Sequence, residues 1–299
     1  VMALPSYATP VQKTYYYLYL FFCGVVFFFL VAPLIAIVPI SFSVSPFMVF
    51  TDGMLAWPPD PEAWSLRWYK NMIGDCSADV VSSTVPCSNK WMIGTLNSFF
   101  IGIVATVIAT SLGTLAALGL SRPHMPFKGI IMAILISPMI VPLIITAAGM
   151  FFFYARINLV YTFTGVILAH VALATPFVVI TVTATLVGFD MNMVKAAQSL
   201  GARPVKTFFR VIMPLILPGI ISGALFAFIT SFDEVVIVMF MASLDQLTIP
   251  KQMWAGIRQE ISPVILCMAT CLVALSIFLL TTVELLRRRS ERLRGIKPR

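Results

Sequence analysis

The residues between Lys13 and Asp52 decide the fold class. Residues 14–51 read TYYYLYLFFCGVVFFFLVAPLIAIVPISFSVSPFMVFT and contain no charged side chain. A run of about 20 apolar residues is long enough to cross a bilayer as a helix. The apolar residues do not alternate with polar ones, as they would in the strands of a membrane barrel. The stretch therefore predicts a membrane-spanning helix over roughly 15–40. Because no small-residue cleavage site follows it, we expect a retained anchor rather than a signal peptide.

The rest of the chain repeats this pattern. Of the 299 residues, 60% are hydrophobic and 11% are charged, whereas soluble domains average about 25% charged residues. An ordinary cytosolic enzyme is therefore excluded. Five more charge-free intervals follow, each long enough for one helix. The prediction is an all-α membrane protein, a single transmembrane domain over 1–299, with spans near 15–40, 93–120, 129–152, 165–187, 215–242 and 264–286.

The distribution of Lys and Arg predicts the orientation of these spans. With the N-terminus in the cytoplasm, the inner segments hold 14 basic residues and the outer segments hold 6. This excess of basic residues is typical of cytoplasmic loops. The formal charge of +8 is then the sum of +11 inside and −3 outside. Both termini are predicted to be cytoplasmic, with a basic tail over 287–299. The basic residues form no single patch, so membrane lipids rather than a nucleic acid are their expected partner.

The outer segment over 41–92 carries two cysteines. Cys76 and Cys87 lie on the predicted periplasmic side, where a disulfide is chemically permitted. We expect a bridge between them, with two free thiols as the alternative.

Two stripes of small residues recur at four-residue spacing. Such stripes let helices approach closely in a membrane, and the spacing fits packing within one subunit or between subunits. The residues are Ala105, Ala109, Gly113 and Ala117 in the second span, and Gly219, Gly223 and Ala227 in the fifth.

The segment over 188–214, predicted to be on the inner side, has residues typical of the start and the end of a short helix. Asp190 or Asn192 can cap its start, and Gly201 suits the left-handed position that ends a helix. Pro204 can open the next helical piece. The pattern predicts a rigid surface helix that inserts into a groove on a cytoplasmic partner. A simple interfacial linker helix is the alternative.

The same segment resembles the EAA motif of ABC-importer permeases. Lys195-Ala196-Ala197 is followed by three residues, Gly201, nine residues and Val211-Ile212-Met213-Pro214. The family motif reads Glu-Ala-Ala, Gly and Ile-x-Leu-Pro at the same spacing, so Lys195 stands where Glu is usual. By this resemblance the segment is the cytoplasmic coupling loop that seats in an ATPase subunit. Its coupling residues are Lys195, Ala196, Ala197, Leu200, Gly201, Ala202 and Pro214.

Further segments resemble permeases of the spermidine/putrescine type. They are Ala174-Thr175-Pro176-Phe177-Val178-Val179, Ser231-Phe232-Asp233-Glu234-Val235-Val236, Ile249-Pro250 and Ile261-Ser262-Pro263. The resemblance implies a type I ABC-importer permease in the bacterial inner membrane, moving a polyamine or related amine by alternating access. Polyamine permeases tend to carry an acidic residue after the proline of span three, where this chain has Pro142-Leu143. A non-polyamine substrate (an amino-acid derivative, an opine or a phosphonate) is the alternative.

The same resemblance implies the partners. They are a second permease subunit in a heterodimer, two ATPase subunits and a periplasmic substrate-binding protein. No cofactor is expected in this chain, and ATP and Mg are expected in the ATPase subunits. The chain itself has no Gly-rich phosphate loop, so another chain must hydrolyse the ATP.

An acidic pair interrupts the apolar run of the fifth predicted span. Asp233 and Glu234 lie among apolar residues, and ionisable groups inside spans are functional by default. We predict that one of them lines the substrate pathway, together with Phe232 and Thr175. A structural hydrogen bond or salt bridge to a neighbouring helix is the alternative.

The sequence does not favour an intramembrane enzyme or a membrane channel over the importer. An intramembrane enzyme would need a metal or nucleophile constellation, and none is present in the sequence. A membrane channel or passive scaffold would not need the helical, Gly-ended inner loop. We therefore expect no catalytic or metal-binding residue in this chain.

Overall fold

A computed structural model describes residues 9–75, 89–122, 124–259 and 261–293. Within these ranges the regular elements are helices, and the strand-type pairing is limited to one isolated bridge between Ser43 and Trp64. The chain divides into two bodies, residues 90–255 and residues 1–89 with 256–299.

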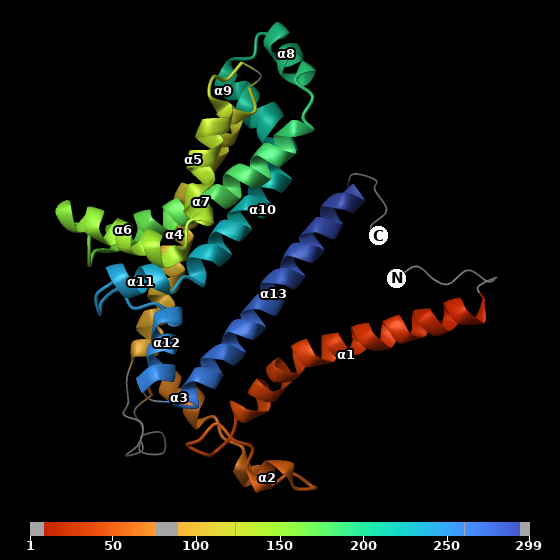
Figure 1. Ribbon diagram of the computed structural model, residues 1–299, viewed down its shortest axis with the longest axis vertical. Helices are drawn as coiled ribbons and strands as arrows, with labels where there is room; N and C mark the ends of the chain where they lie inside the picture. Colours follow the sequence, from red (N-terminus) through yellow and green to blue (C-terminus); the bar gives the residue numbers. More distant parts are fainter. Residues whose placement is uncertain (1–8, 76–88, 123, 260, 294–299) are drawn as a thin grey trace. The chain divides into compact units, whose positions relative to one another are not determined.

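The body of residues 90–255 is built on three long helices, α4, α7 and α10 (Figure 1). Its helices are α4 (Lys90–Leu120), α5 (Lys128–Ile140), α6 (Leu143–Arg156), α7 (Phe163–Val187), α8 (Asn192–Ser199), α9 (Pro204–Thr207), the π-helical turn η2 (Phe208–Ile212), α10 (Met213–Phe232), α11 (Val236–Met241) and the start of α12 (Ile249–Gln259).

The predicted fold class is confirmed. In the described residues five helical segments are long and apolar enough to cross a membrane, and a sixth span results if α5 and α6 count together. The five are Pro10–Ile40, Lys90–Leu120, Phe163–Val187, Pro204–Phe232 and Val264–Thr281. The orientation of these spans stays a prediction.

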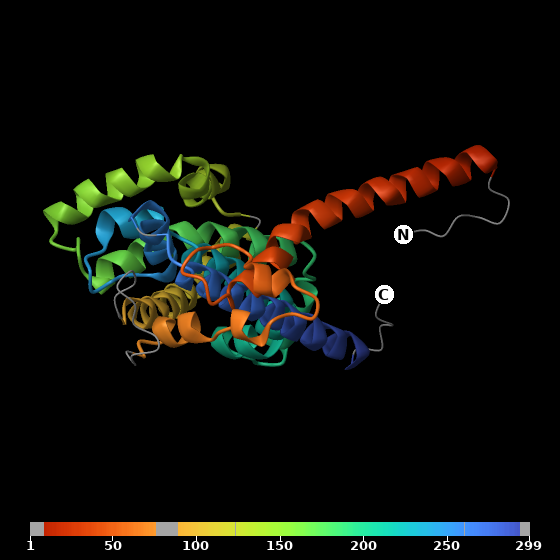
Figure 2. The ribbon, with the colours of Figure 1, turned by 90° about the horizontal axis from the view of Figure 1, so that it is seen from below.

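The third predicted span is broken, and a single helix over 129–152 was wrong. The chain bends by 103° between α5 and α6, and the change of direction is visible in both ribbon views (Figures 1 and 2). The break falls at Val141 and Pro142, whose backbones are extended, with ψ of 137° and 128°. A proline disfavours the helical conformation of the residue before it and supplies no N–H for the helix. Pro138, by contrast, is accommodated inside α5.

The fifth predicted span ends earlier than the apolar pattern indicates. We expected one helix over 215–242, but α10 ends at Phe232 and a separate short helix, α11, begins at Val236. The acidic pair lies in the break between them and not inside a continuous helix. Hydropathy alone misses this break, because the residues on both sides of it are apolar.

Small residues bring α4, α7 and α10 into close contact. A Cβ atom on Gly113 of α4 would lie 2.7 Å from the Val178 side chain of α7, and one on Gly223 of α10 would lie 2.5 Å from the Thr181 hydroxyl. The alanines of both stripes are fully buried. Both small-residue stripes therefore pack inside this body, which answers the question that their spacing left open.

The other body contains α1 (Pro10–Ile40), α2 (Asp52–Leu55), the turn η1 (Pro61–Ala63), α3 (Arg67–Met72) and α13 (Val264–Leu293). α1 is one long helix with none of its residues buried (Figure 2). Trp68 of α3 is fully buried, and its indole N–H donates to the Ser43 carbonyl at 2.9 Å. The Cys267 thiol of α13 donates to the Ser41 carbonyl at 3.3 Å. These bonds join α3 and α13 to the end of α1.

Two predictions reach beyond the described residues. The proposed bridge between Cys76 and Cys87 lies outside them. Part of the predicted basic tail over 287–299 is helical, because α13 continues to Leu293, whereas residues 294–299 lie outside the described range.

Candidate functional site

The predicted coupling loop forms a helix whose end is closed by backbone hydrogen bonds. The Gly201 N–H donates to the Gln198 carbonyl at 2.9 Å, and the Ala202 N–H donates to the Ala197 carbonyl at 3.0 Å. Gly201 itself has a φ of 79°. This pair of bonds around a left-handed residue is the Schellman motif, which ends a helix sharply. The glycine prediction for the end of α8 is thus confirmed by its backbone geometry.

The N-cap position of α8 is Met191, which makes no side-chain cap bond, so neither Asp190 nor Asn192 occupies it as predicted. The Asp190 carboxylate, one residue earlier, accepts a hydrogen bond from the Asn192 N–H at 2.9 Å and so still satisfies the first N–H of the helix. Pro204 occupies the first turn of α9, and Pro214 occupies the first turn of α10. The turn between α9 and α10 is the π-helical η2, so the two helices form one continuous path from the loop into the span.

α8 offers an exposed surface rather than a buried one. Lys195, Ala196 and Gly201 are exposed, while Ala197 and Ala202 are half-buried. Leu200 is 89% exposed, so its apolar side chain is available for contact with another surface. The loop thus combines a rigid backbone with an apolar tip, the combination that a docking element needs.

The acidic pair is split by the structure into two different environments. Glu234 is only 7% exposed, and its carboxylate accepts the Ile237 N–H at 2.9 Å. Asp233 follows the last residue of α10 and is exposed. Glu234 therefore caps the start of α11, whereas the Asp233 carboxylate remains open to a ligand.

The opposite end of α11 is held by a residue that the sequence analysis missed. The Lys251 ammonium donates to the Val238 carbonyl at 3.3 Å and to the Ala242 carbonyl at 2.9 Å. Partial burial lowers the pKa of this ammonium from its ordinary value. Lys251 lies in the first turn of α12, in a segment predicted to be outer. The signal that could have found it is its position eight residues after Ser243, in the Ile-Pro-Lys start of a helix that follows α11.

The C-terminal end of α10 is also fixed to α7. The His170 Nδ1 atom and the Ser231 hydroxyl are 2.8 Å apart, and both side chains are buried. This contact joins α7 to α10 and places Ser231 against α7 two residues before Asp233.

The two other predicted pathway residues lie in different places. Phe232 is half-buried beside Asp233, and its ring contacts Phe99 and Phe228 with centroids 5.2 and 5.3 Å away. Thr175 lies on α7, about 7.5 Å along the helix from His170 at 1.5 Å per residue. Its hydroxyl donates to the Val171 carbonyl at 2.6 Å, so it is engaged by its own helix. Phe232 thus shares the break with Asp233, while Thr175 does not.

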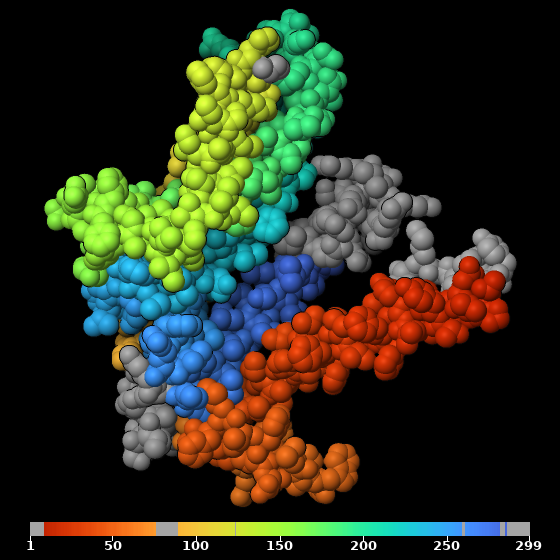
Figure 3. Space-filling view, in the orientation of Figure 1, coloured from red at the N-terminus to blue at the C-terminus, as the bar shows by residue number. Residues whose placement is uncertain are grey.

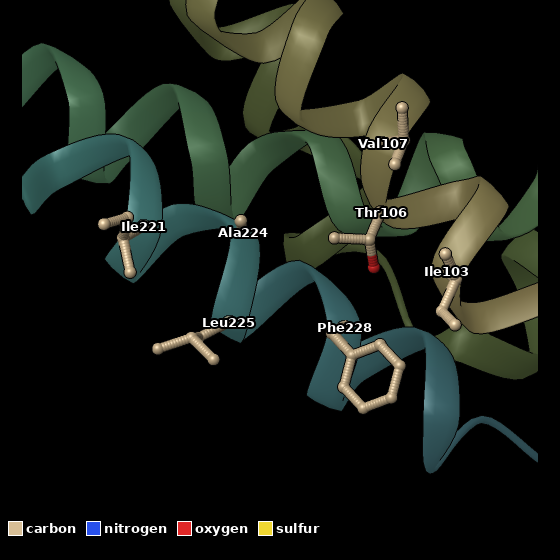
Figure 4. A pocket seen from close by; sticks show the side chains of 7 residues that line it. All are labelled: Ile103, Thr106, Val107, Ile221, Ala224, Leu225 and Phe228. Carbon is tan, nitrogen blue, oxygen red and sulfur yellow. The ribbon is translucent and has the colours of Figure 1, made fainter. Parts of the chain in front are cut away.

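An apolar groove of about 280 Å³ lies between α4 and α10. It reaches Phe228, one of the three rings that contact one another near the end of α10. Figure 4 shows the side chains of α4 and α10 that line it, with Thr106 of α4 on the side of Ala224 of α10. The groove is lined by Ile103, Thr106, Val107, Ile221, Ala224, Leu225 and Phe228.

Within the described ranges, no group of His, Cys, Asp and Glu side chains could hold a metal ion. Three of the cysteines described there, Cys23, Cys267 and Cys271, are free thiols.

A bundle of membrane-crossing helices with a rigid, exposed helix between its fourth and fifth spans is the construction of an ABC-importer permease subunit. The chain belongs to the family described as binding-protein-dependent transport system inner membrane component, which matches residues 109–292. It is thus a multi-pass inner membrane protein that works with an ATPase and a binding protein and has no ATPase domain of its own.

Relatives cover most of the chain. The spermidine/putrescine transport system permease protein PotC of Haemophilus influenzae is 27% identical over 271 residues, 90% of this chain and 96% of the relative. The putrescine transport system permease protein PotI of Escherichia coli is 30% identical over 252 residues, 82% of this chain and 81% of the relative.

One solved structure supports the fold. A bacterial ABC transporter involved in the import of the acidic polysaccharide alginate matches with a TM-score of 0.71 at 12% identity, over 94% of this chain and 99% of the other. At this identity the likeness concerns the fold alone.

Proposed function

We propose that this subunit moves a polyamine or a related amine-containing solute from a periplasmic binding protein to the cytoplasm. The observation that carries the proposal is the free carboxylate of Asp233 beside the partly exposed ring of Phe232. A carboxylate attracts an alkylammonium ion, and aromatic faces add a cation–π contribution. The relatives named for spermidine and putrescine transport support the same class of substrate.

In this proposal the subunit forms the pathway with a second, non-identical permease subunit. Two ATPase subunits, which hold ATP and Mg, dock on the α8 helix of each permease. Closure of the ATPases draws the two coupling helices together and exchanges an inward-facing for an outward-facing pathway. Leu200 supplies the apolar contact of the docking surface, and the Schellman end at Gly201 holds it in place.

A pair of isosteric variants tests the substrate assignment. In vesicles that contain the complete importer, Asp233→Asn should raise the half-saturating concentration of labelled putrescine about tenfold, because it removes one charged contact. Glu234→Gln is the matched control: its remaining amide oxygen can still accept the Ile237 N–H, so its half-saturating concentration should change little.

The opposite results would overturn the assignment. Equal kinetics for Asp233→Asn and the unmodified importer would remove Asp233 from the pathway. Failure of unlabelled putrescine and spermidine to compete, together with competition by an amino-acid derivative, an opine or a phosphonate, would replace the amine with that class. Mass spectrometry of the small molecule that copurifies with the binding protein would then name the substrate.

A further inference from the structure

The short helix α11 is held by side chains at both of its ends. At its start, the Glu234 carboxylate accepts the Ile237 N–H at 2.9 Å. At its end, the Lys251 ammonium donates to the carbonyls of Val238 and Ala242. A negative group at the start and a positive group at the end both complement the helix dipole. Since a six-residue helix has little stability alone, these two caps add to the packing of its buried side chains in holding α11.

α11 is packed where it can transmit movement. Three of its side chains, Ile237, Val238 and Met241, are fully buried, and the helix contacts α6 and α7. The Met241 carbonyl also accepts the Tyr161 N–H at 2.8 Å, from the loop between α6 and α7. A displacement of α11 should therefore also displace α6 and the loop that joins α6 to α7.

The loop that follows α11 is anchored on α4. The Ile249 N–H donates to the Ser98 hydroxyl at 2.8 Å, and the Asn97 amide donates to the carbonyls of Asp245 and Leu247. Lys251 thus reaches α11 from a position that α4 already fixes. Its side chain therefore links α12 to α11.

α10 connects this network to the coupling loop. α8 and α9 lie at one end of α10, and α11 lies at the other (Figure 1). Its 20 residues make it about 30 Å long at 1.5 Å per residue. A stiff helix with a fixed element at each end is the kind of contiguous structure through which two distant sites can be coupled.

We propose that Lys251 is a positioning residue of the import reaction: opposite Glu234 it caps α11, so that the outer ends of α6 and α10 move as one body with α8. The proposal rests on the proposed docking of α8 to the ATPase. Without the ammonium, α11 and the break at Asp233 would no longer follow the coupling helix.

The test measures ATPase activity of the complete importer in lipid nanodiscs, with and without its binding protein. Lys251→Met keeps the apolar stem and removes the ammonium. We expect the ratio of stimulated to basal ATPase rates to fall about tenfold, the population change that one charged hydrogen bond produces, while the basal rate and the amount of assembled complex stay normal. Lys251→Arg should restore the ratio, which loss of folding alone would not allow.

A double-mutant cycle separates a shared role from two unrelated ones. Glu234→Met removes the other cap, and both losses loosen the same helix. The double variant should therefore be no worse than the more affected single variant. Arg156→Met, which removes an exposed cation at the end of α6, is the matched control and should leave the ratio unchanged.

Each result decides one proposal. A normal ratio in Lys251→Met, beside a disturbed ratio in the coupling-loop variant Gly201→Val, would overturn the role of Lys251 and leave the docking of α8 intact. A normal ratio in Gly201→Val would overturn the docking itself. Strictly additive losses in the double variant would also reject the common cap of α11.

Discussion

At the scale of single residues, Gly219 sets the distance between α10 and α7. A Cβ atom on Gly219 would overlap the Thr185 hydroxyl and would lie 2.8 Å from the Thr185 Cβ. Such overlap forces a backbone shift in a packed interior and costs about 1–3 kcal/mol. The glycine is therefore required by the close approach of the two helices.

We predict that Gly219→Ala lowers the thermal midpoint of the purified complex and its yield in the membrane. Gly149→Ala is the matched control, because a Cβ there meets nothing within 4 Å. Alanine is the better helix former, so this control should be neutral or slightly stabilising. Equal stability of the two variants in a thermal-shift assay would contradict the packing that the structure shows.

Single residues also show the limits of sequence analysis. The acidic pair was recognised as unusual, but both carboxylates look alike in the sequence. Their difference arises from the end of α10 at Phe232, which leaves Glu234 next to the free N–H groups of α11. Lys251 was missed because its partners are backbone carbonyls, which leave no trace in the side-chain pattern.

At the scale of elements, the end of α8 depends on a left-handed residue. Gly201 has a φ of 79°, whereas Gly188, at the end of α7 in the same loop, has a φ of −87°. The left-handed conformation costs an L-residue roughly 1–2 kcal/mol, and β-branched residues adopt it least readily. The two glycines therefore tolerate substitution differently, although both are exposed.

We predict that Gly201→Val uncouples ATP hydrolysis from transport by distorting the end of α8, while Gly188→Val remains coupled. The measurement is the number of ATP molecules hydrolysed per solute imported. The ratio should rise several-fold only in Gly201→Val. A ratio that rises equally in both variants would point to a general disturbance of the loop and not to its Schellman end.

The helices were well predicted where a long apolar run is bounded by residues that start or end a helix. The start of α10 near Pro214 and the end of α8 at Gly201 both follow from local backbone chemistry. The break after Ile140 falls at Pro142, where a continuous span with a kink was predicted. The break after Phe232 was not predicted, because apolar residues lie on both sides of it. A proline such as Pro138 can equally remain inside a helix.

At the scale of the whole molecule, the orientation in the membrane still rests on the distribution of Lys and Arg. Two exposed leucines give a direct test of it. Leu200 follows α8 on the predicted inner side, and Leu244, 80% exposed, follows α11 on the predicted outer side. Neither is buried by its own body, so both should be open to a reagent from their own side of the membrane.

In a variant from which the native cysteines are removed, a membrane-impermeant maleimide should label Leu244→Cys in intact cells. Leu200→Cys, in cells that lack the ATPase subunit proposed to cover it, should be labelled only after the membrane is opened. The reverse pattern would place both termini outside and would separate α8 from any cytoplasmic ATPase.

The bend between α5 and α6 has a consequence for the lipid around this subunit. α5 has 13 residues and is about 20 Å long, whereas the hydrocarbon core of a bilayer is about 30 Å thick. α6, turned by 103°, carries exposed Ile144, Ile145, Phe152 and Phe153; Figure 3 shows the surface of the two helices in yellow and green. Where lipid covers these exposed faces, acyl chains contact α6 along its side, and only the short helix α5 supplies apolar length across the bilayer. Hydrophobic mismatch should therefore be largest at this point, so that import slows as the acyl chains of the host membrane lengthen.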